Sequence, residues 1–248
     1  MLSKIKINKK IKPFNKILEI EGDKSLSIRW ALLASQAEGI SKSTNLLKSE
    51  DVINTINCLK KLGVKIELKK RVCKIYGLGL NGYKYKKKIT LNAGNSGTLA
   101  RLIMGLLVHA KSKIKIIGDK SLSSRDFYRV TVPLEKFGAK FKTNFGKLPI
   151  TISGTDLPQS IKYNENRGSA QCKSSVMLAA LNTGGETVIK AKKSRNHSEL
   201  LFKNLKLGIK VIKKNNIDLI KVKGKSVSWE YQGKTYIFQQ SKFSISPS

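Results

Sequence analysis

The stretch Leu59-Lys-Lys-Leu-Gly63-Val-Lys-Ile66 decides the fold, because it recurs twice in the same chain. The second copy is Leu134-Glu-Lys-Phe-Gly138-Ala-Lys-Phe141, and the third is Asn204-Leu-Lys-Leu-Gly208-Ile-Lys-Val211. The glycines lie 75 and 70 residues apart (138 − 63 and 208 − 138). In each copy we expect a helix to end, the glycine to supply a left-handed C-cap, and an alternating strand to follow.

The sequence upstream of each copy repeats as well, with a polar helix start, an apolar helical run and a second helix start. The first starts are Lys24-Ser25, Asn95-Ser96-Gly97-Thr98 and Ser169-Ala170-Gln171. The second starts are Ser49-Glu50-Asp51, Ser123-Ser124-Arg125 and Ser194-Arg195-Asn196, where serine is a favoured N-cap. Pro133 falls inside the later helix of the second copy and predicts a kink or an irregular start there. We therefore expect an α/β domain of three repeated α/β units, with the helices inside and the sheets outside.

The composition sets limits on the class of protein. The 248 residues carry a formal net charge of +33 and are 40% hydrophobic, which excludes a wholly disordered chain. The longest apolar stretch, near Leu102–Val108, is far shorter than the roughly 20 residues of a membrane-spanning helix. Three cysteines without a CxxC motif are typical of reduced thiols in a cytosolic protein, and two histidines with no cysteine near either in the sequence argue against a metal site.

The positive charge comes mostly from lysine, since only seven of the 49 basic residues are arginine. The lysines are spread along the whole chain, which indicates a compositional habit; the alternative is a basic nucleic-acid-binding module, which would usually cluster its charge on one face. Where arginine is scarce, a retained arginine marks a place that needs a planar fork for phosphate or carboxylate.

A cation follows each of the first helix starts by about one turn: Arg29, Arg101 and Lys173. Helix N-termini bind anions, so three such starts brought together predict a pocket for a multiply charged anion. The alternative is that these are ordinary caps with solvated cations beside them. By spacing, the sequence contains no Ser-His-Asp arrangement, no Walker A loop and no evident acid–base pair.

Six blocks of the sequence resemble, in order, the motifs of the 5-enolpyruvylshikimate-3-phosphate (EPSP) synthase family. They are Gly22–Leu33, Asn45–Asp51, Gly94–Arg101, Gly118–Arg125, Ser169–Ser174 and Ser194–Glu199. The resemblance covers about residues 15–215. It implies the inside-out α/β domain of the enolpyruvyl transferases.

The family reaction joins shikimate 3-phosphate to phosphoenolpyruvate (PEP) and uses no metal or organic cofactor. The resemblance implies that Lys24 contacts both substrates and is the catalytic cation. It assigns shikimate 3-phosphate to Ser25, Arg29, Ser169, Gln171 and Arg195, and PEP to Gly97 and Arg125. Asn95, Thr98 and Arg101 are expected to shape the loop between them.

The chain departs from the family pattern in two respects. Asp23 and Asp126 stand where the family usually has serine and proline, and Asp23 is expected to weaken anion binding. Family enzymes also have a second domain that carries the proton-transfer residues. The resemblance therefore implies an N-terminal domain at 21–240, a segment 1–20 that pairs with the absent domain, and a truncated crossover at 241–248. We expect an incomplete form that is inactive alone, with a separate C-terminal half as its partner; the alternative is a catalytically inactive substrate-binding fragment.

Overall fold

The computed structural model describes residues 20–69, 72–224, 228–231 and 234–237, and isolated positions before residue 20. The expectations for the segment 1–20 and for the crossover at 241–248 lie outside these continuous stretches. The last described strands, β12 (Ser228–Tyr231) and β13 (Lys234–Ile237), form an antiparallel pair of their own.

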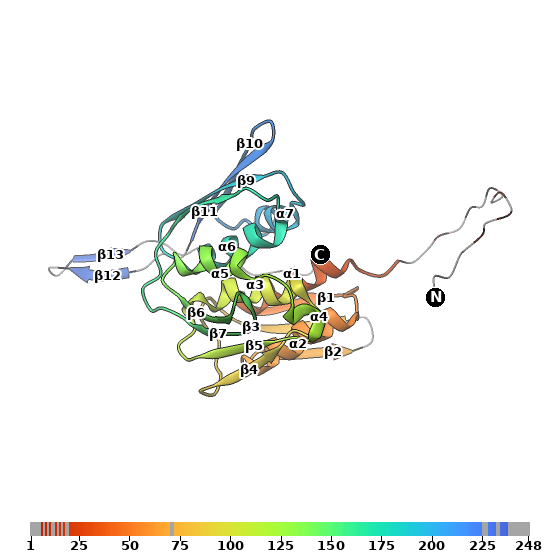
Figure 1. Ribbon diagram of the computed structural model, residues 1–248, viewed down its shortest axis with the longest axis horizontal. Coiled ribbons are helices and arrows are strands. Elements are labelled where there is room, and N and C mark those ends of the chain that lie inside the picture. Colours follow the sequence, from red (N-terminus) through yellow and green to blue (C-terminus); the bar gives the residue numbers. More distant parts are fainter. Residues whose placement is uncertain are drawn as a thin grey trace.

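The described chain repeats one pattern three times, as expected (Figure 1). The first unit consists of α1 (Lys24–Gln36), β1 (Glu38–Ser43), α2 (Glu50–Lys61), β2 (Lys65–Lys69) and β3 (Val72–Leu78). The second consists of β4 (Ile89–Asn92), α3 (Gly97–Leu106), η1 (Leu107–His109), β5 (Ile114–Ile117), α4 (Lys120–Ser123), α5 (Tyr128–Glu135), β6 (Lys140–Asn144) and β7 (Lys147–Ser153). The third consists of β8 (Lys162–Glu165), α6 (Ala170–Leu181), β9 (Glu186–Lys192), α7 (His197–Asn204), β10 (Ile209–Lys213) and β11 (Ile217–Lys223).

The three sheets share one strand order. The antiparallel trios are β1-β3-β2, β5-β7-β6 and β9-β11-β10. In the second and third units a further strand, β4 or β8, adds in parallel to β5 or β9. The internal repeat in the sequence is therefore a repeat of sheet topology.

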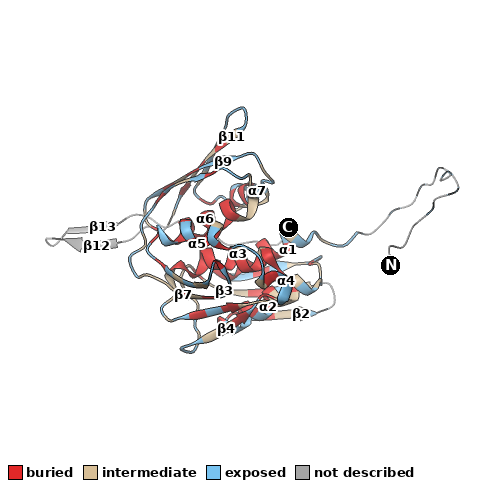
Figure 2. Cartoon of the chain, viewed as in Figure 1, coloured by how far each residue is buried: buried red, intermediate tan, exposed pale blue. Residues whose placement is uncertain are grey.

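The helices α1, α3 and α6 form the centre, and Figure 2 shows them largely buried between the sheets. In α6 every residue from Cys172 to Leu181 is buried. The helices α3 and α6 pack so closely that a Cβ on Gly105 would lie 2.2 Å from the backbone oxygen of Ser175. Burial of a Leu or Ile side chain contributes roughly 1.5–3 kcal/mol, so this helix-rich centre supplies much of the stability.

The repeated glycine plays its expected part in two copies only. Gly63 and Gly138 have positive φ values of 89° and 105° after their helices. In the third copy the prediction is wrong, because Lys206 (φ 52°) is the left-handed residue and Leu207 N–H bonds to Phe202 O at 2.9 Å. Gly208 is needed for another reason: a Cβ there would lie 2.7 Å from the backbone oxygen of Lys223 on β11.

The second helix start of the middle unit also differs from the prediction. Ser123 ends the short helix α4, and α5 begins only at Tyr128. The residue before it, Phe127, donates its backbone N–H to the backbone oxygen of Gly146 at 2.8 Å. Pro133 lies inside α5, as the sequence indicated. The starts at Ser49 and Asn196 are where we expected them, although neither side chain makes a capping hydrogen bond.

The structure also describes the cysteines and the lengths of the helices. Cys58, Cys73 and Cys172 are free and buried. No helix among the described residues has the length and apolar character needed to cross a bilayer.

Candidate active site

The three inner helices begin with capped first turns. Asp23 caps α1, because its Oδ1 accepts a hydrogen bond from the backbone N–H of Leu26 at 2.7 Å. Ser96 and Ser169 cap α3 and α6 in the same way, each by accepting a 3.2 Å hydrogen bond from the backbone N–H three residues on, that of Leu99 or Cys172. The other first-turn N–H groups and the helix dipole favour an anion at each start. The carboxylate of Asp23, unexpected in the family pattern, thus has a structural task as an N-cap.

Arg29 of α1 is only 5% exposed and is fixed by three hydrogen bonds. Its Nε donates to Ser198 Oγ (2.9 Å), its Nη1 to the backbone oxygen of Ser25 (3.1 Å) and its Nη2 to Ser174 Oγ (3.4 Å). Ser198 Oγ in turn donates to Ser174 Oγ at 2.7 Å, so hydroxyls from α6 and α7 hold one guanidinium of α1. This set, with Lys173 and Glu199, is called the Arg29 cluster below.

The Arg29 cluster contains more buried positive than buried negative charge. Lys173 is fully buried and pairs with Glu199 at 2.5 Å (Nζ to Oε1). Glu199 is itself 5% exposed, and its Oε2 accepts no hydrogen bond from a described residue. Burial lowers the pKa of Arg29, while the Glu199 carboxylate opposes that shift and Arg195 adds to it. Two buried cations against one buried carboxylate leave a positive surplus, which is costly to desolvate without an anion.

Arg101 of α3 reaches across to α6. Its Nη1 donates to Gln171 Oε1 at 2.9 Å, and Gln171 Nε2 donates to Thr98 Oγ1 at 2.9 Å. The guanidinium also lies 5.0 Å from the ring centre of Phe127. Burial lowers the pKa of Arg101, with Arg125 and Arg129 adding like-charge repulsion. Gln171 is therefore held between two residues of the glycine-rich loop and helix.

Arg125 and Gly97 form the second charged region, called the Arg125 cluster together with Asn95 and Asp119. Arg125 Nη2 donates to Asn95 Oδ1 (3.1 Å), and Asn95 Nδ2 donates to Asp119 Oδ2 (2.5 Å). A Cβ on Gly97 would lie 2.8 Å from Nη1 of Arg101 and 3.0 Å from Nη1 of Arg125. Because Gly97 has no side chain, two guanidinium groups approach the first turn of α3.

The remaining predicted site residues are less closely connected. Lys24 has a half-exposed side chain (51%) and pairs with Asp51 at 3.1 Å (Nζ to Oδ2), with no bond to either cluster. Ser25 contributes its backbone oxygen to Arg29, and Ser169 contributes its hydroxyl as the α6 cap. Arg195 is exposed, and it lies near enough to lower the pKa of Arg29.

The start of α6 connects the two charged regions, because Ser174 contacts Arg29 and Gln171 contacts Arg101. The sequence indicated Lys173 as a cation beside a helix start, but it gave no role to Ser174, Ser198 or Glu199. Only the position of these residues beside Arg29 in space reveals them; the spacing along the chain does not.

The comparison with protein-family models gives a match over residues 8–238. The matching family is described as EPSP synthase (3-phosphoshikimate 1-carboxyvinyltransferase). The match covers both clusters.

Curated relatives agree with the family match. A 3-phosphoshikimate 1-carboxyvinyltransferase from Ruthia magnifica subsp. Calyptogena magnifica is 43% identical over 215 residues, which is 85% of this chain and 49% of the relative. One from Thermoanaerobacter sp. (strain X514) is 43% identical over 197 residues, covering 79% of this chain and 46% of the relative. The chain thus spans about half the length of the curated relatives it matches.

Solved structures agree as well. An EPSP synthase from Acinetobacter baumannii superposes with a TM-score of 0.76 and 34% identity, covering 84% of this chain and 46% of that one. The fold predicted from the repeat, with inner helices and outer sheets, is confirmed by this similarity.

Proposed function

The chain belongs to the EPSP synthase family, and from that premise we propose that it binds shikimate 3-phosphate and PEP at the starts of α1, α3 and α6. The proposed reaction is transfer of the enolpyruvyl group: the 5-hydroxyl oxygen of the shikimate ring bonds to C2 of PEP, and inorganic phosphate then leaves the tetrahedral intermediate. The contribution of these residues is to position two anions and to stabilise charge.

The observation that carries the proposal is the buried positive surplus of the Arg29 cluster. Arg29 and Lys173 are buried beside a single buried carboxylate, Glu199. A folded protein keeps such a surplus where an anion completes it, and a phosphate monoester beside Arg29 would do so.

The roles within the proposal are those that the family resemblance implies. Ser25, Arg29, Ser169, Gln171 and Arg195 would hold shikimate 3-phosphate. Gly97 and Arg125 would hold PEP, since the missing side chain at Gly97 lets the guanidinium groups of Arg101 and Arg125 lie against the first turn of α3.

Lys24 is proposed to contact both substrates, which requires its ammonium to leave Asp51 or to share it. A half-exposed pair of this kind is weak, and a bound dianion competes with it readily. Asn95, Thr98 and Arg101 shape the loop through the bonds described above.

Isothermal titration with shikimate 3-phosphate and with shikimate tests the proposal. We expect the phosphorylated ligand alone to give heat, and Arg29→Gln to weaken its binding by about 30-fold or more, because a lost buried charge contact costs about 2 kcal/mol or more. Lys42→Gln on β1 removes an exposed cation and should leave the affinity unchanged. Equal binding of both ligands, or no heat at millimolar concentration, would contradict the proposal. Salt-sensitive RNA binding that responds to scattered lysines rather than to Arg29 would favour the nucleic-acid alternative.

We propose further that residues 21–240 act as the substrate-holding domain, and that turnover needs the part of the relatives' sequence that lies outside the match. The expected result is substrate binding without phosphate release by this chain. Addition of the C-terminal half of the Thermoanaerobacter relative should restore phosphate release. If both parts are folded and their mixture still releases no phosphate, the proposal that the two halves together form the active enzyme is contradicted.

A further inference from the structure

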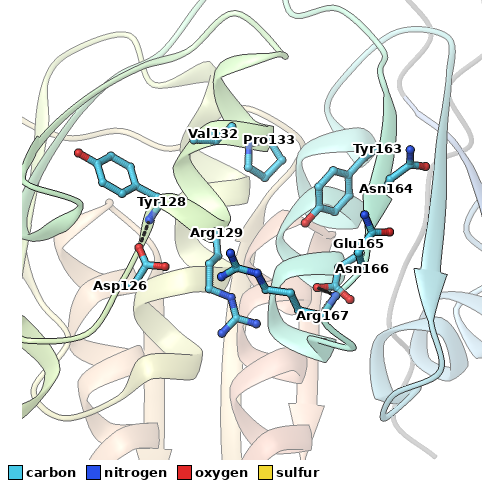
Figure 3. Close-up of a pocket in the computed structure, with 10 residues that line it drawn as sticks. All are labelled: Asp126, Tyr128, Arg129, Val132, Pro133, Tyr163, Asn164, Glu165, Asn166 and Arg167. Carbon is cyan, nitrogen blue, oxygen red and sulfur yellow. Dashed lines mark hydrogen bonds between the residues drawn. The ribbon is translucent and has the colours of Figure 1, made fainter.

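A pocket of about 340 Å³ lies between α5 and the end of β8, and it shares no lining residue with the proposed substrate-binding residues (Figure 3). Val132 and Pro133 of α5 form one side, and Tyr163 of β8 stands on the other. Its volume falls in the range of small-molecule sites, which begins at roughly 300 Å³.

Two arginines extend into the pocket from its opposite walls. Figure 3 shows Arg167, from the loop after β8, reaching across the pocket toward the side chain of Arg129 of α5. Neither guanidinium forms a hydrogen bond or an ion pair with any residue in the described part of the chain, and Nε of Arg129 is buried. Buried donors in native structures nearly always have a partner, and two like charges facing one another repel. Both facts favour an anion between them.

The carboxylates that line the pocket are engaged elsewhere. Asp126 Oδ1 accepts from the backbone N–H of Tyr128 at 2.8 Å. The two oxygens of Glu165 accept from the backbone N–H groups of Arg167 (3.2 Å) and Ser169 (2.8 Å). They therefore hold the chain at two helix starts, and the donors of Arg129 and Arg167 stay available.

Tyr163 supplies a third donor. Burial raises the pKa of its phenol, Cys172 and the Glu165 carboxylate raise it further, and Arg129 and Arg167 act in the opposite direction. The phenol is therefore neutral and able to donate at neutral pH. Guanidinium forks bind phosphate and carboxylate oxygens, and a phosphate dianion would neutralise both positive charges.

We propose that this pocket is a second anion site, which binds a phosphate dianion, either free or as a small monoester. It lies next to the proposed substrate site, because Arg101 Nη2 reaches the backbone oxygen of Asp126 at 3.4 Å. The proposal does not depend on the proposed function, since none of its contacts involve Arg29 or Arg125.

Titration of ¹⁵N-arginine-labelled protein with inorganic phosphate at constant ionic strength tests it, with the arginine Nε–Hε signals as the readout. We expect the signals of Arg129 and Arg167 to shift along one common curve, and to keep doing so in an Arg29→Gln, Arg125→Gln double variant. Arg167→Gln should weaken phosphate binding, measured at the Arg129 signal, about tenfold, because it removes one charge-assisted hydrogen bond. Lys162→Gln, which removes an exposed cation on the same strand, should leave it unchanged.

Three results would overturn the proposal: no shift at either arginine, equal effects of Arg167→Gln and Lys162→Gln, or loss of the response in the double variant. Arg129→Lys offers a second variant that keeps the charge and loses the fork, and it should also weaken the Arg167 curve. A parallel titration with phenyl phosphate distinguishes the sources. Tighter binding than that of inorganic phosphate identifies a monoester that uses the apolar wall, and equal binding identifies free phosphate.

Discussion

The Arg29 cluster and the Arg125 cluster hold their arginines in opposite ways. Arg29 is buried, bonded to two serine hydroxyls and a backbone oxygen, and faces the buried carboxylate of Glu199. Arg125 is exposed and has one side-chain partner, Asn95. Folding therefore fixes the first arginine before any ligand arrives, whereas the second keeps conformational freedom that a ligand must remove.

Among substitutions in the two clusters, we expect Glu199→Gln to change the stability most. It leaves Lys173 buried without a counter-charge, so we expect a loss of about 3–5 kcal/mol in the free energy of unfolding. Urea denaturation measures it. Glu186→Gln is the matched control, because its pair with Lys221 is largely exposed and contributes about 0–1 kcal/mol. Equal losses in the two variants would show that the Arg29 cluster is no more rigid than the surface.

Two glycine substitutions in α3 give the next effect. Gly105→Ala puts a methyl group 2.2 Å from a backbone oxygen of α6, so we expect about 1–3 kcal/mol of destabilisation. Gly97→Ala meets only the ends of Arg101 and Arg125, which can move, so it should change stability by less than about 0.5 kcal/mol. It should still weaken PEP binding, because the displaced guanidiniums no longer frame the site. A large loss of stability in Gly97→Ala would mean that the Arg125 cluster is as closely packed as the helix centre.

Ser96→Ala should cost about 1 kcal/mol, because it removes the side-chain cap of α3 and leaves the Leu99 N–H without a partner in a buried turn. Thermal unfolding measures the change. Ser124→Ala is a suitable comparison, since that hydroxyl is exposed and only donates to the backbone oxygen of Ser121. If both variants melt at the same temperature, the cap contributes nothing.

The smallest expected effect is a pH dependence in the Arg125 cluster. The hydrogen bond from Leu122 N–H, followed by that from Asn95, lowers the pKa of Asp119 below its ordinary value. The stability that Asp119 contributes is thus fully present above its unfolded-state pKa and is lost as the pH falls through the lower folded-state pKa. Asp119→Asn should flatten the acid limb of a stability–pH curve, and an unchanged limb would exclude this role.

The sequence predicted the units well, because helix starts and periodicity are local signals. Ser96 and Ser169 are caps where their motifs placed them, and the three copies fold into sheets of one strand order. Lys206 was not foreseen, since lysine has no intrinsic preference for the left-handed conformation that it adopts after α7. The late start of α5 was not foreseen either, since it accompanies the bond of Phe127 to a distant turn at Gly146.

The site was predictable only in part. The scarcity of arginine directed attention to that residue type, and the chain also carries Arg129 and Arg167, which no motif singled out. Their convergence depends on α5 packing near the end of β8. Lys173 and Glu199 likewise lie 26 positions apart in the sequence (199 − 173) and on different helices. Their spacing along the chain does not predict that they pair.

A crystal structure of the chain soaked with shikimate 3-phosphate tests most directly whether the two clusters serve one ligand. We expect the phosphate group beside Arg29 and the ring near Gln171, at the starts of α1 and α6. Density only among the surface lysines, or no bound ligand at millimolar concentration, would contradict the proposed site.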